Sequence, residues 1–555
     1  MLVLDKIFKI ISLTMSILVA YKTVWLIIGL FCKPKKYADT DKRFKYAVVI
    51  CARNEEKVIA QIIDSIHKQD YDQDKISIFV MAHNCTDNTA QIARDNGAIV
   101  YEWNAPDKRR KGYALEYLFE QIKKDYGYEA FDSYLFLDAD NLLKQDYISQ
   151  INKAFGAGEK VVGTYRNTKN FDTNSISAAY GFHFYRQSMF SNRPRSLMGL
   201  GTSVAGTGFA MHNSILVKND GWHFLGLTED NEFSLQMAID GVKIAYCEDA
   251  EFYDEQPTNM KTAWTQRLRW TKGILVSFFA HMGGLFKTMF GKGRTFQQRV
   301  TAYDLFFHFF PYYPFGLFVG LFWPIITGVV GVFRPDLFVA GRQFMSILTW
   351  AGGFYFSLLA FGILLYIRER KHIVCKPKHI VKYLFTWAWF DLINFPLFVV
   401  AVSRKIEWKQ IDHNIAKTID EMNEEYMDPS KTNTDNANVV ASDTTAVNET
   451  TLTQSEVMSN TIETQQPQVS HDDEIAILPL LNEEYPVNVD HANENKVGET
   501  IKENSNIDDI EMLEVSEEEI LNTEQSKEEV LEQKSELMEK LKENIKHKKD
   551  KSDIA

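Results

Sequence analysis

Two carboxylates one residue apart, Asp138 and Asp140, directly follow an apolar run and have the spacing of a metal site. Side chains of a strand alternate between its two faces, so residues two apart point the same way. Two oxygen donors on one side suit Mg²⁺ or Mn²⁺, and such an ion neutralises charge that develops on a departing diphosphate. We therefore predict a Mg²⁺ or Mn²⁺ site at Asp138 and Asp140. The alternative is a solvated acidic loop.

A second acidic pair, Glu229 and Asp230, stands at the predicted start of a helix. Thr228 is a good N-cap residue, and Gly241 ends the helical pattern. The positive end of a helix favours the ionised form of a carboxylate in its first turn. We predict that Asp230 takes a proton from an attacking sugar hydroxyl, with Glu229 beside it in the catalytic pair. The alternative is that both acids only stabilise the helix start.

Gln266, Arg269, Trp270 and Gly273 have the spacing of one helix face, on a helix predicted to start near Thr258. Arginine binds a pyrophosphate through two parallel hydrogen bonds. The tryptophan ring offers a flat apolar platform for a sugar, and the glutamine amide can donate to and accept from hydroxyls. An amphipathic helix at a membrane interface would carry similar residues. We expect both descriptions to hold.

The elements that must position these residues alternate between strand and helix over residues 45–257. Predicted strands are Tyr46–Cys51, Ile76–Met81, Ala98–Trp103 and Ser133–Leu137, and predicted helices are Glu55–Gln69, Thr86–Asn96 and Gly112–Lys124. This alternation predicts an α/β domain with a mostly parallel, Rossmann-like sheet covered on both faces. Such sheets bind ligands at the carboxyl ends of their strands. Neither a dinucleotide-binding nor a P-loop motif is present in the sequence.

Apolar runs flank this domain at Ile7–Phe31, Tyr303–Phe333, Phe344–Ile367 and Tyr383–Val402. We predict a transmembrane helix within residues 1–33, interfacial helices over 258–300 and a transmembrane region over 301–405. Basic residues are dense just after the first run, which places the following domain in the cytoplasm. The run that contains Asp391 and Pro396 crosses once, is re-entrant or lies at the membrane interface.

The net charge of −13 comes from the end of the chain, which is rich in Glu, Asp, Asn and Thr. We predict a disordered acidic linker over residues 420–506 and a charged helix or weak coiled coil over 507–550. This tail solubilises the protein or binds an unknown protein partner, and we expect no nucleic acid partner. The five cysteines show no metal or disulfide spacing, so we expect reduced thiols.

The order of these motifs resembles the processive family 2 glycosyltransferases, which include cellulose, hyaluronan and chitin synthases. The similarity covers roughly residues 45–290 and the membrane segments, and Thr228-Glu229-Asp230 is nearest to the form found in cellulose and other β-glucan synthases. The resemblance implies a GT-A fold, a UDP-sugar donor and Mg²⁺ or Mn²⁺. The stretch from Trp408 to His413 is similar to a short tryptophan motif near the end of such synthases, and we assign it no role.

The resemblance also implies residue roles. Five residues would hold the UDP-sugar, namely Arg53, Glu55, Asp87, Lys111 and Asp138. Asp140 would bind the metal ion together with Asp138, and Asp230 would be the general base. Gln266, Arg269 and Trp270 would hold the diphosphate and the growing glycan acceptor.

These roles predict a multi-pass plasma membrane enzyme, in contact with membrane lipid, that polymerises and exports a β-linked polysaccharide. A β-glucan from UDP-glucose, including a mixed-linkage one, is the leading product. The alternatives are a polymer of β-linked N-acetylglucosamine, transfer of a single sugar to a lipid or other membrane acceptor, and a non-catalytic membrane scaffold.

Overall fold

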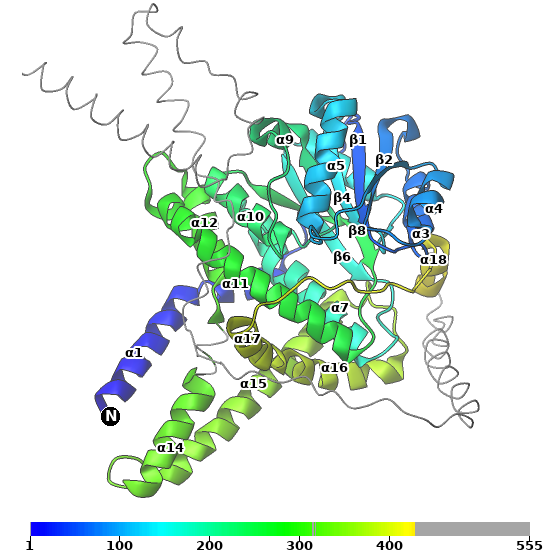
Figure 1. Ribbon diagram of the computed structural model, residues 1–555. Coiled ribbons are helices and arrows are strands. Elements are labelled where there is room, and N and C mark those ends of the chain that lie inside the picture. The colour runs from blue at the N-terminus through cyan, green and yellow to red at the C-terminus, as the bar shows by residue number, and fades with distance from the viewer. Residues whose placement is uncertain (1, 313–315, 317, 428–555) are drawn as a thin grey trace, which may run out of the picture. The chain divides into compact units, whose positions relative to one another are not determined.

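The computed structural model describes residues 2–312, 316 and 318–427, and an eight-stranded sheet lies at its centre (Figure 1). The strand order is β3-β2-β1-β4-β7-β6-β8-β5. The strands are β1 (Tyr46–Ala52), β2 (Ile76–His83), β3 (Ile99–Trp103), β4 (Ser133–Asp138), β5 (Leu142–Leu143), β6 (Val161–Thr168), β7 (Phe209–His212) and β8 (Ile244–Asp254).

The sheet is mixed and mostly parallel, because only β5 and β7 run against the direction of the other strands. Strands β1 to β4 pair in parallel, as the alternation of strands and helices predicts. Strand β7 then runs antiparallel to both β4 and β6, and β5 runs antiparallel to β8, whereas β6 and β8 are parallel. The predicted α/β class with a mostly parallel sheet is therefore confirmed.

Both faces of the sheet are buried under helices. On β1, Val48 and Ile50 point into one core while Ala47 and Val49 point into the other. The first core is covered by α3 (Ile59–His67), α4 (Thr89–Asp95) and α6 (Tyr147–Gly156), and the second by α5 (Lys111–Asp125), α9 (Asn213–Asn219) and α10 (Glu229–Asp240). A strand buried on both faces is apolar throughout, which made β1 easy to predict.

Two of these helices begin later than their sequence pattern predicts. The chain before α3 forms a turn in which the Val58 N–H donates to the Glu55 carbonyl oxygen at 3.0 Å. Before α4, the Asp87 carboxylate accepts from the Thr89 N–H at 3.1 Å. The polar residues after β1 and β2 are thereby kept in loops at the carboxyl edge of the sheet.

A second layer of helices lies beneath this edge (Figure 1). Helix α11 (Met260–Phe290) is long and apolar enough to cross a membrane, yet it packs beside α10 and α12 (Phe296–Phe309). Its Thr288 Oγ1 donates to the carbonyl oxygen of Ile239 in α10 at 3.4 Å. The other helical elements here are α7 (Ser175–Gln187), the π-helical turn η3 (Ser188–Asn192) and α8 (Arg193–Leu197), and 3-10 turns lie at Gln73–Lys75 and Tyr128–Ala130.

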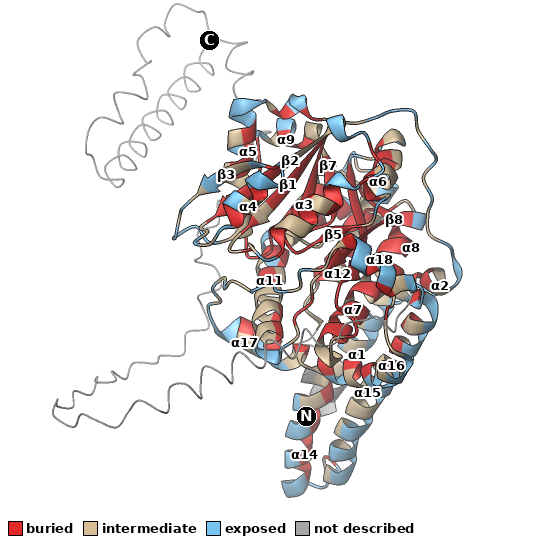
Figure 2. Ribbon diagram, turned by 90° about the vertical axis from the view of Figure 1, so that its right-hand side faces the viewer, coloured by how far each residue is buried: buried red, intermediate tan, exposed pale blue. Residues whose placement is uncertain are grey.

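Apolar helices project from this body or lie against it. Those that project are α1 (Leu2–Val19), α14 (Trp323–Phe333), preceded by η4 (Phe318–Phe322), and α15 (Ala340–Glu369). Those that pack against the body are α2 (Lys22–Phe31), α16 (Pro377–Leu392) and α17 (Asn394–Ser403). Within the described chain, four segments are long and apolar enough to cross a membrane. Helices α1, α14 and α15 expose side chains such as Ile10, Val332 and Leu348, each more than 60% exposed (Figure 2). Apolar surface of this extent fits lipid, so the protein is membrane-associated and multi-pass.

The apolar run Tyr303–Phe333 is not one continuous helix. Its first residues belong to α12, which packs beside α10 and α11, and its last residues form α14. Helix α12 ends at Phe309, and Phe310 has left the helical conformation. This break explains why the run is too long for one membrane helix.

After α17, residues 404–418, here called the strap, return to the sheet domain without regular structure (yellow in Figure 1). The predicted linker begins too early, because Ile419–Met427 forms helix α18. Ile419 and Met422 are buried against Leu142 and Tyr253, and this long-range packing orders the segment. The predictions for residues 428–506 and 507–550 lie outside the described residues.

Candidate active site

One cavity of about 1060 Å³ collects nearly all the predicted site residues. Its lining includes Arg53, Glu55, Lys111, Asp138, Asp140, Glu229, Asp230, Gln266, Arg269 and Trp270. Asp87 is not part of this lining. Its carboxylate turns to the backbone and accepts from the N–H groups of Glu56 and Thr89 at 3.2 and 3.1 Å. Asp87 therefore ties the loops after β1 and β2 together, and its contact with a donor stays a prediction.

Asp138, the first residue of the acidic pair after β4, is held from two sides. Asp138 ends β4 and forms an ion pair with Lys111, the first residue of α5. The Lys111 Nζ also donates to the carbonyl oxygen of Gly206 at 2.9 Å. The Asp138 N–H donates to Thr207 Oγ1 at 2.9 Å. The loop before β7 thus fixes both the position and the charge partner of Asp138.

Asp140 is buried, and burial raises the pKa of its carboxyl to about 8. Its Oδ2 accepts from the Glu255 N–H at 3.3 Å. A buried carboxylate of this kind needs a nearby cation to stay ionised, and its hard oxygen donors fit Mg²⁺ or Mn²⁺. No three His, Cys, Asp or Glu side chains among the described residues already form a metal cluster.

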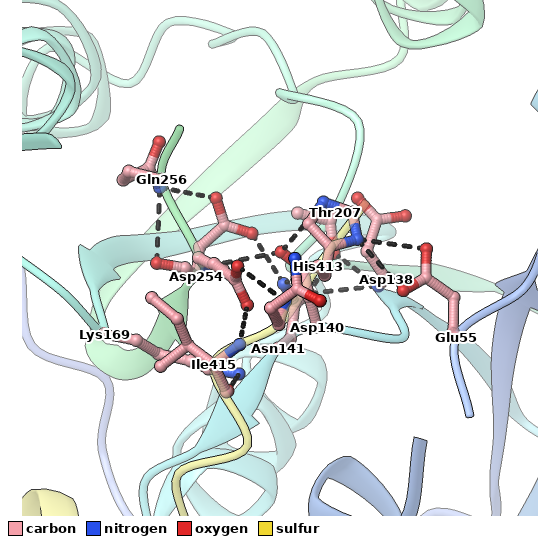
Figure 3. Close-up of polar contacts among 12 residues, drawn as sticks. Glu55, Asp138, Asp140, Asn141, Lys169, Thr207, Asp254, Gln256, His413 and Ile415 are labelled. Carbon is pink, nitrogen blue, oxygen red and sulfur yellow. Dashed lines mark hydrogen bonds and ion pairs between the residues drawn. The ribbon is translucent and has the colours of Figure 1, made fainter. Parts of the chain in front are cut away.

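Figure 3 shows how this edge is connected to β8 and to the strap. Asn141 Nδ2 donates to Asp254 Oδ1 at 2.7 Å, and Gln256 Nε2 donates to Asp254 Oδ2 at 2.6 Å. From the strap, His413 places Nδ1 3.0 Å from a Glu55 oxygen and Nε2 3.8 Å from Asp140 Oδ2. Sequence reasoning assigned no role to His413. Trp408 and His413 stand out in the polar stretch after the last apolar run, and this was the available sign that the stretch contacts the site.

The second acidic pair opens α10 as predicted, and Gly241 ends the helix with φ +75°. Burial raises the pKa of Glu229 to about 7, and the neighbouring Asp230 adds to that shift. Burial also raises the pKa of Asp230, while a backbone hydrogen bond and Arg269 oppose the shift. Thr228 occupies the N-cap position, but its side chain makes no capping hydrogen bond.

The predicted face of α11 lines the same cavity. Arg269 donates to the carbonyl oxygen of Leu227 at 3.0 Å, which holds its guanidinium beside the start of α10. Trp270 packs edge-to-face on Tyr180, with ring centroids 5.9 Å apart. Gln266 Oε1 is buried and has no hydrogen-bond partner within the described part of the chain. A ligand hydroxyl would satisfy this acceptor.

Comparison with known proteins agrees with this arrangement. The family model "Glycosyltransferase like family 2" matches residues 43–273. These residues form a family 2 glycosyltransferase domain. The family 2 part of the prediction is thus confirmed and the protein is an enzyme, whereas its processive character and the nearer likeness to β-glucan synthases stay predictions. The glycosyltransferase domain has the GT-A type of α/β sheet, with the acidic pair directly after β4.

Individual relatives are distant. The probable glycosyltransferase YdaM of Bacillus subtilis (strain 168) is 25% identical over 385 residues, or 66% of this chain and 85% of that protein. The poly-beta-1,6-N-acetyl-D-glucosamine synthase of Staphylococcus aureus (strain COL) is 23% identical over 242 residues, covering 42% of this chain and 56% of its own length. The mannosyltransferase PcManGT from Pyrobaculum calidifontis, solved with GDP-Man and Mn²⁺, is 15% identical, with a TM-score of 0.41 over 70% of this chain and 97% of its own.

Gly273→Ala should slow the glycosyltransferase by about 10²-fold, because small misplacements of binding groups are costly. A Cβ at Gly273 would lie 2.5 Å from Thr228 Oγ1, so α11 must move away from the start of α10 and take Arg269 and Trp270 with it. Steady-state kinetics on purified protein would measure the loss. Gly283→Ala in the same helix meets nothing within 4 Å and should keep full activity. Equal activity of the two variants would refute this account.

Proposed function

We propose that this protein is an inverting glycosyltransferase that polymerises a β-linked polysaccharide from a UDP-sugar and exports it across the plasma membrane. The leading product is a β-glucan, including a mixed-linkage one, made from UDP-glucose. The cavity carries the proposal, because it continues from the two acidic pairs to aromatic side chains of the membrane helices. These are Trp25, Phe361 and Phe398, with Phe190 of η3 beside them. A cavity lined in this way suits an acceptor longer than one sugar.

Different side chains have different roles in this single-displacement reaction. Arg53, Glu55, Lys111 and Asp138 hold the UDP part of the donor, with Arg269 at the diphosphate. Asp230 accepts the proton of the acceptor hydroxyl as its oxygen attacks the anomeric carbon from the face opposite the diphosphate. An α-linked donor then yields a β-linkage. A Mg²⁺ or Mn²⁺ ion held at Asp140 and Asp138 would neutralise the charge of the leaving diphosphate.

We place the glycosyltransferase domain in the cytoplasm. Lys33, Lys35, Lys36, Lys42 and Arg43 lie between α2 and β1, and such basic flanks stay on the cytoplasmic side. UDP-sugars are made in the cytoplasm, so this side also supplies the donor.

Sealed membrane vesicles that contain the protein test the proposal. We expect UDP release from UDP-glucose that requires a divalent cation and Asp230, with a glucanase-sensitive product of high molecular weight. A short or lipid-linked product would instead support transfer of a single sugar. No release from any UDP-sugar by folded protein would overturn the catalytic proposal.

A polymer of β-linked N-acetylglucosamine is the second candidate, favoured by the similarity to the Staphylococcus aureus synthase. The same vesicles separate the two products, because UDP-N-acetylglucosamine would then be the preferred donor and the product would resist glucanase. The two donors differ by one acetamido group, and a few pocket contacts decide between them.

The activity should fall as the pH decreases, with a midpoint above the ordinary aspartate value of about 4. A carboxyl whose pKa is raised is protonated below that raised value, and burial raises the pKa of Asp230. A protonated Asp230 cannot accept a proton, so the low-pH side of the profile loses activity. Glu229 adds no charge at this limb, because its pKa of about 7 leaves it protonated at lower pH. Initial rates of UDP release between about pH 4 and 9 record the limb, and a midpoint at or below the ordinary aspartate value would contradict the account.

A further inference from the structure

The corner where α15 meets α16, residues 368–382, presents five cationic side chains on the surface of the molecule. They are Arg368, Arg370, Lys371, Lys378 and Lys382, and all are exposed. Within the described part of the chain, no hydrogen bond or ion pair joins any of these side chains to another residue. The acids nearby already have other partners, Glu369 with Arg193 at 3.0 Å and Asp172 with His379 at 2.9 Å. The corner is therefore cationic without internal compensation.

One side of α16 changes from cationic to apolar along the helix. Lys378, Lys382, Phe385 and Trp389 follow one another at intervals of four, three and four residues, so they share one helix face. Phe385 and Trp389 are 50% and 65% exposed, and the two lysines are exposed as well. The opposite face is buried against α7 and α15, which lie beside it (Figure 2). We call the four exposed residues the α16 stripe.

A charged amphiphile fits this order of side chains better than water or plain hydrocarbon does. Large exposed rings are unfavourable in water, whereas unpaired lysines are unfavourable in hydrocarbon. An anionic phospholipid meets both requirements, because its phosphate attracts clustered lysine and arginine at the membrane surface. Tryptophan is also enriched at that level of a membrane. A zwitterionic lipid brings its own cation and gains less from the five charges of the corner.

The corner has a fixed shape before any lipid arrives. His372 Nδ1 lies 2.9 Å from Glu251 Oε1, so the loop between the two helices is fastened to β8. The hydroxyl of Tyr355 in α15 donates to the carbonyl oxygen of Phe385 at 3.3 Å, and its ring lies 5.1 Å from that of Trp389. A preformed site loses less entropy when a ligand binds. The lysines and rings are thus held in place for a ligand.

We propose that this corner binds an anionic phospholipid, with the headgroup at its lysines and arginines and the acyl chains along Phe385 and Trp389. The inference goes beyond the proposed function, because it does not depend on which sugar is transferred. A lipid held here fixes the sheet domain at the bilayer surface, since the same loop contacts Glu251 of β8.

Native mass spectrometry of the full-length protein in detergent tests the assignment, with phosphatidylglycerol and phosphatidylcholine of identical acyl chains as probes. The wild-type protein should bind phosphatidylglycerol more tightly than phosphatidylcholine. Lys378→Gln combined with Lys382→Gln should weaken phosphatidylglycerol binding about tenfold or more, because each cation at a membrane surface adds to the attraction. The same variant should leave phosphatidylcholine binding unchanged. Trp389→Ala removes part of the apolar end of the α16 stripe and should weaken the binding of both lipids.

The matched control is Lys124→Gln with Lys160→Gln, which removes two exposed lysines of the sheet domain outside the corner. It should bind both lipids as the wild-type protein does. Equal binding of the two lipids to the wild-type protein, or a preference that survives Lys378→Gln with Lys382→Gln, overturns the proposal.

A competition experiment separates a lipid site from a site for soluble phosphate. Displacement of phosphatidylglycerol by glycerol 3-phosphate at equal concentration would overturn the lipid assignment, and persistence of the bound lipid supports it. Arg370→Gln with Lys371→Gln changes only the loop outside both helices and should also reduce the preference for phosphatidylglycerol. This second variant keeps the proposal open to refutation where substitutions in α16 prevent folding.

Discussion

Asp230→Asn should lower the rate of sugar transfer by about 10²- to 10⁴-fold, the usual contribution of a general base. The amide has nearly the same shape as the carboxylate but cannot accept the proton of the acceptor hydroxyl. Donor binding should persist, because Lys111, Asp138 and Arg269 are untouched. Single-turnover UDP release measures the chemical step, and calorimetry with UDP measures donor binding.

Asp240→Asn is the matched control, since it makes the same change at the other end of α10. Asp240 pairs with Lys218 at 3.0 Å and is not part of the cavity lining. Its rate should stay within about twofold of wild type, as expected for a surface substitution. A similar loss in both variants would show that the helix tolerates neither change, and full activity of Asp230→Asn would remove Asp230 from the mechanism.

Asp304→Ala should reduce the free energy of unfolding by about 3–5 kcal/mol, the cost of leaving a buried charge without its partner. The side chains of Arg195 and Asp304 form an ion pair and are each only 1% exposed. The hydroxyl of Tyr21 also donates to Asp304 Oδ1 at 2.7 Å, and Trp25 Nε1 donates to the same oxygen at 3.3 Å. One carboxylate thereby ties α2 to α8 and α12. Thermal unfolding in detergent, followed by tryptophan fluorescence, would record the loss.

Asp336→Ala provides the comparison. Asp336 pairs with Arg334 at 2.8 Å, and both side chains are about 60% exposed. Exposed pairs contribute roughly 0–1 kcal/mol, so this variant should unfold close to the wild-type temperature. Replacing both partners of the buried pair, as in Arg195→Met with Asp304→Leu, should recover part of the stability because no unpaired charge remains. Equal decreases in unfolding temperature for Asp304→Ala and Asp336→Ala would contradict this account.

Local patterns predicted the first half of the sheet and the residues that follow its strands. Strands β1, β2 and β4 are short apolar runs, so hydrophobic periodicity identified them and placed Asp138 at a carboxyl end. The end of α10 at Gly241 and the face of α11 also follow local rules, namely a left-handed glycine and helical spacing. These signals lie within a few residues of the side chains they position.

The second half of the sheet depends on contacts far apart in the sequence. Strand β5 has two residues and β7 has four, too few for a periodic signal. Strand β6 contains the charged residue Arg166, which is neutralised by an ion pair with Asp254 of β8. His413 meets Asp140 only because the strap returns from the membrane helices. No local pattern could supply these pairings.

That return of the strap favours one of the alternatives for how the last apolar segment relates to the membrane. Helix α16 begins beside the glycosyltransferase domain, where the Lys376 N–H donates to Asp172 Oδ2 at 3.0 Å. The strap that follows α17 is back at Arg53 by Gln410. Both flanks of Pro377–Ser403 thus contact the same part of the protein, and we predict that the segment dips into the bilayer and returns. A protease added to sealed vesicles should accordingly reach a site engineered after Met427 only when it also reaches the sugar-transferring face.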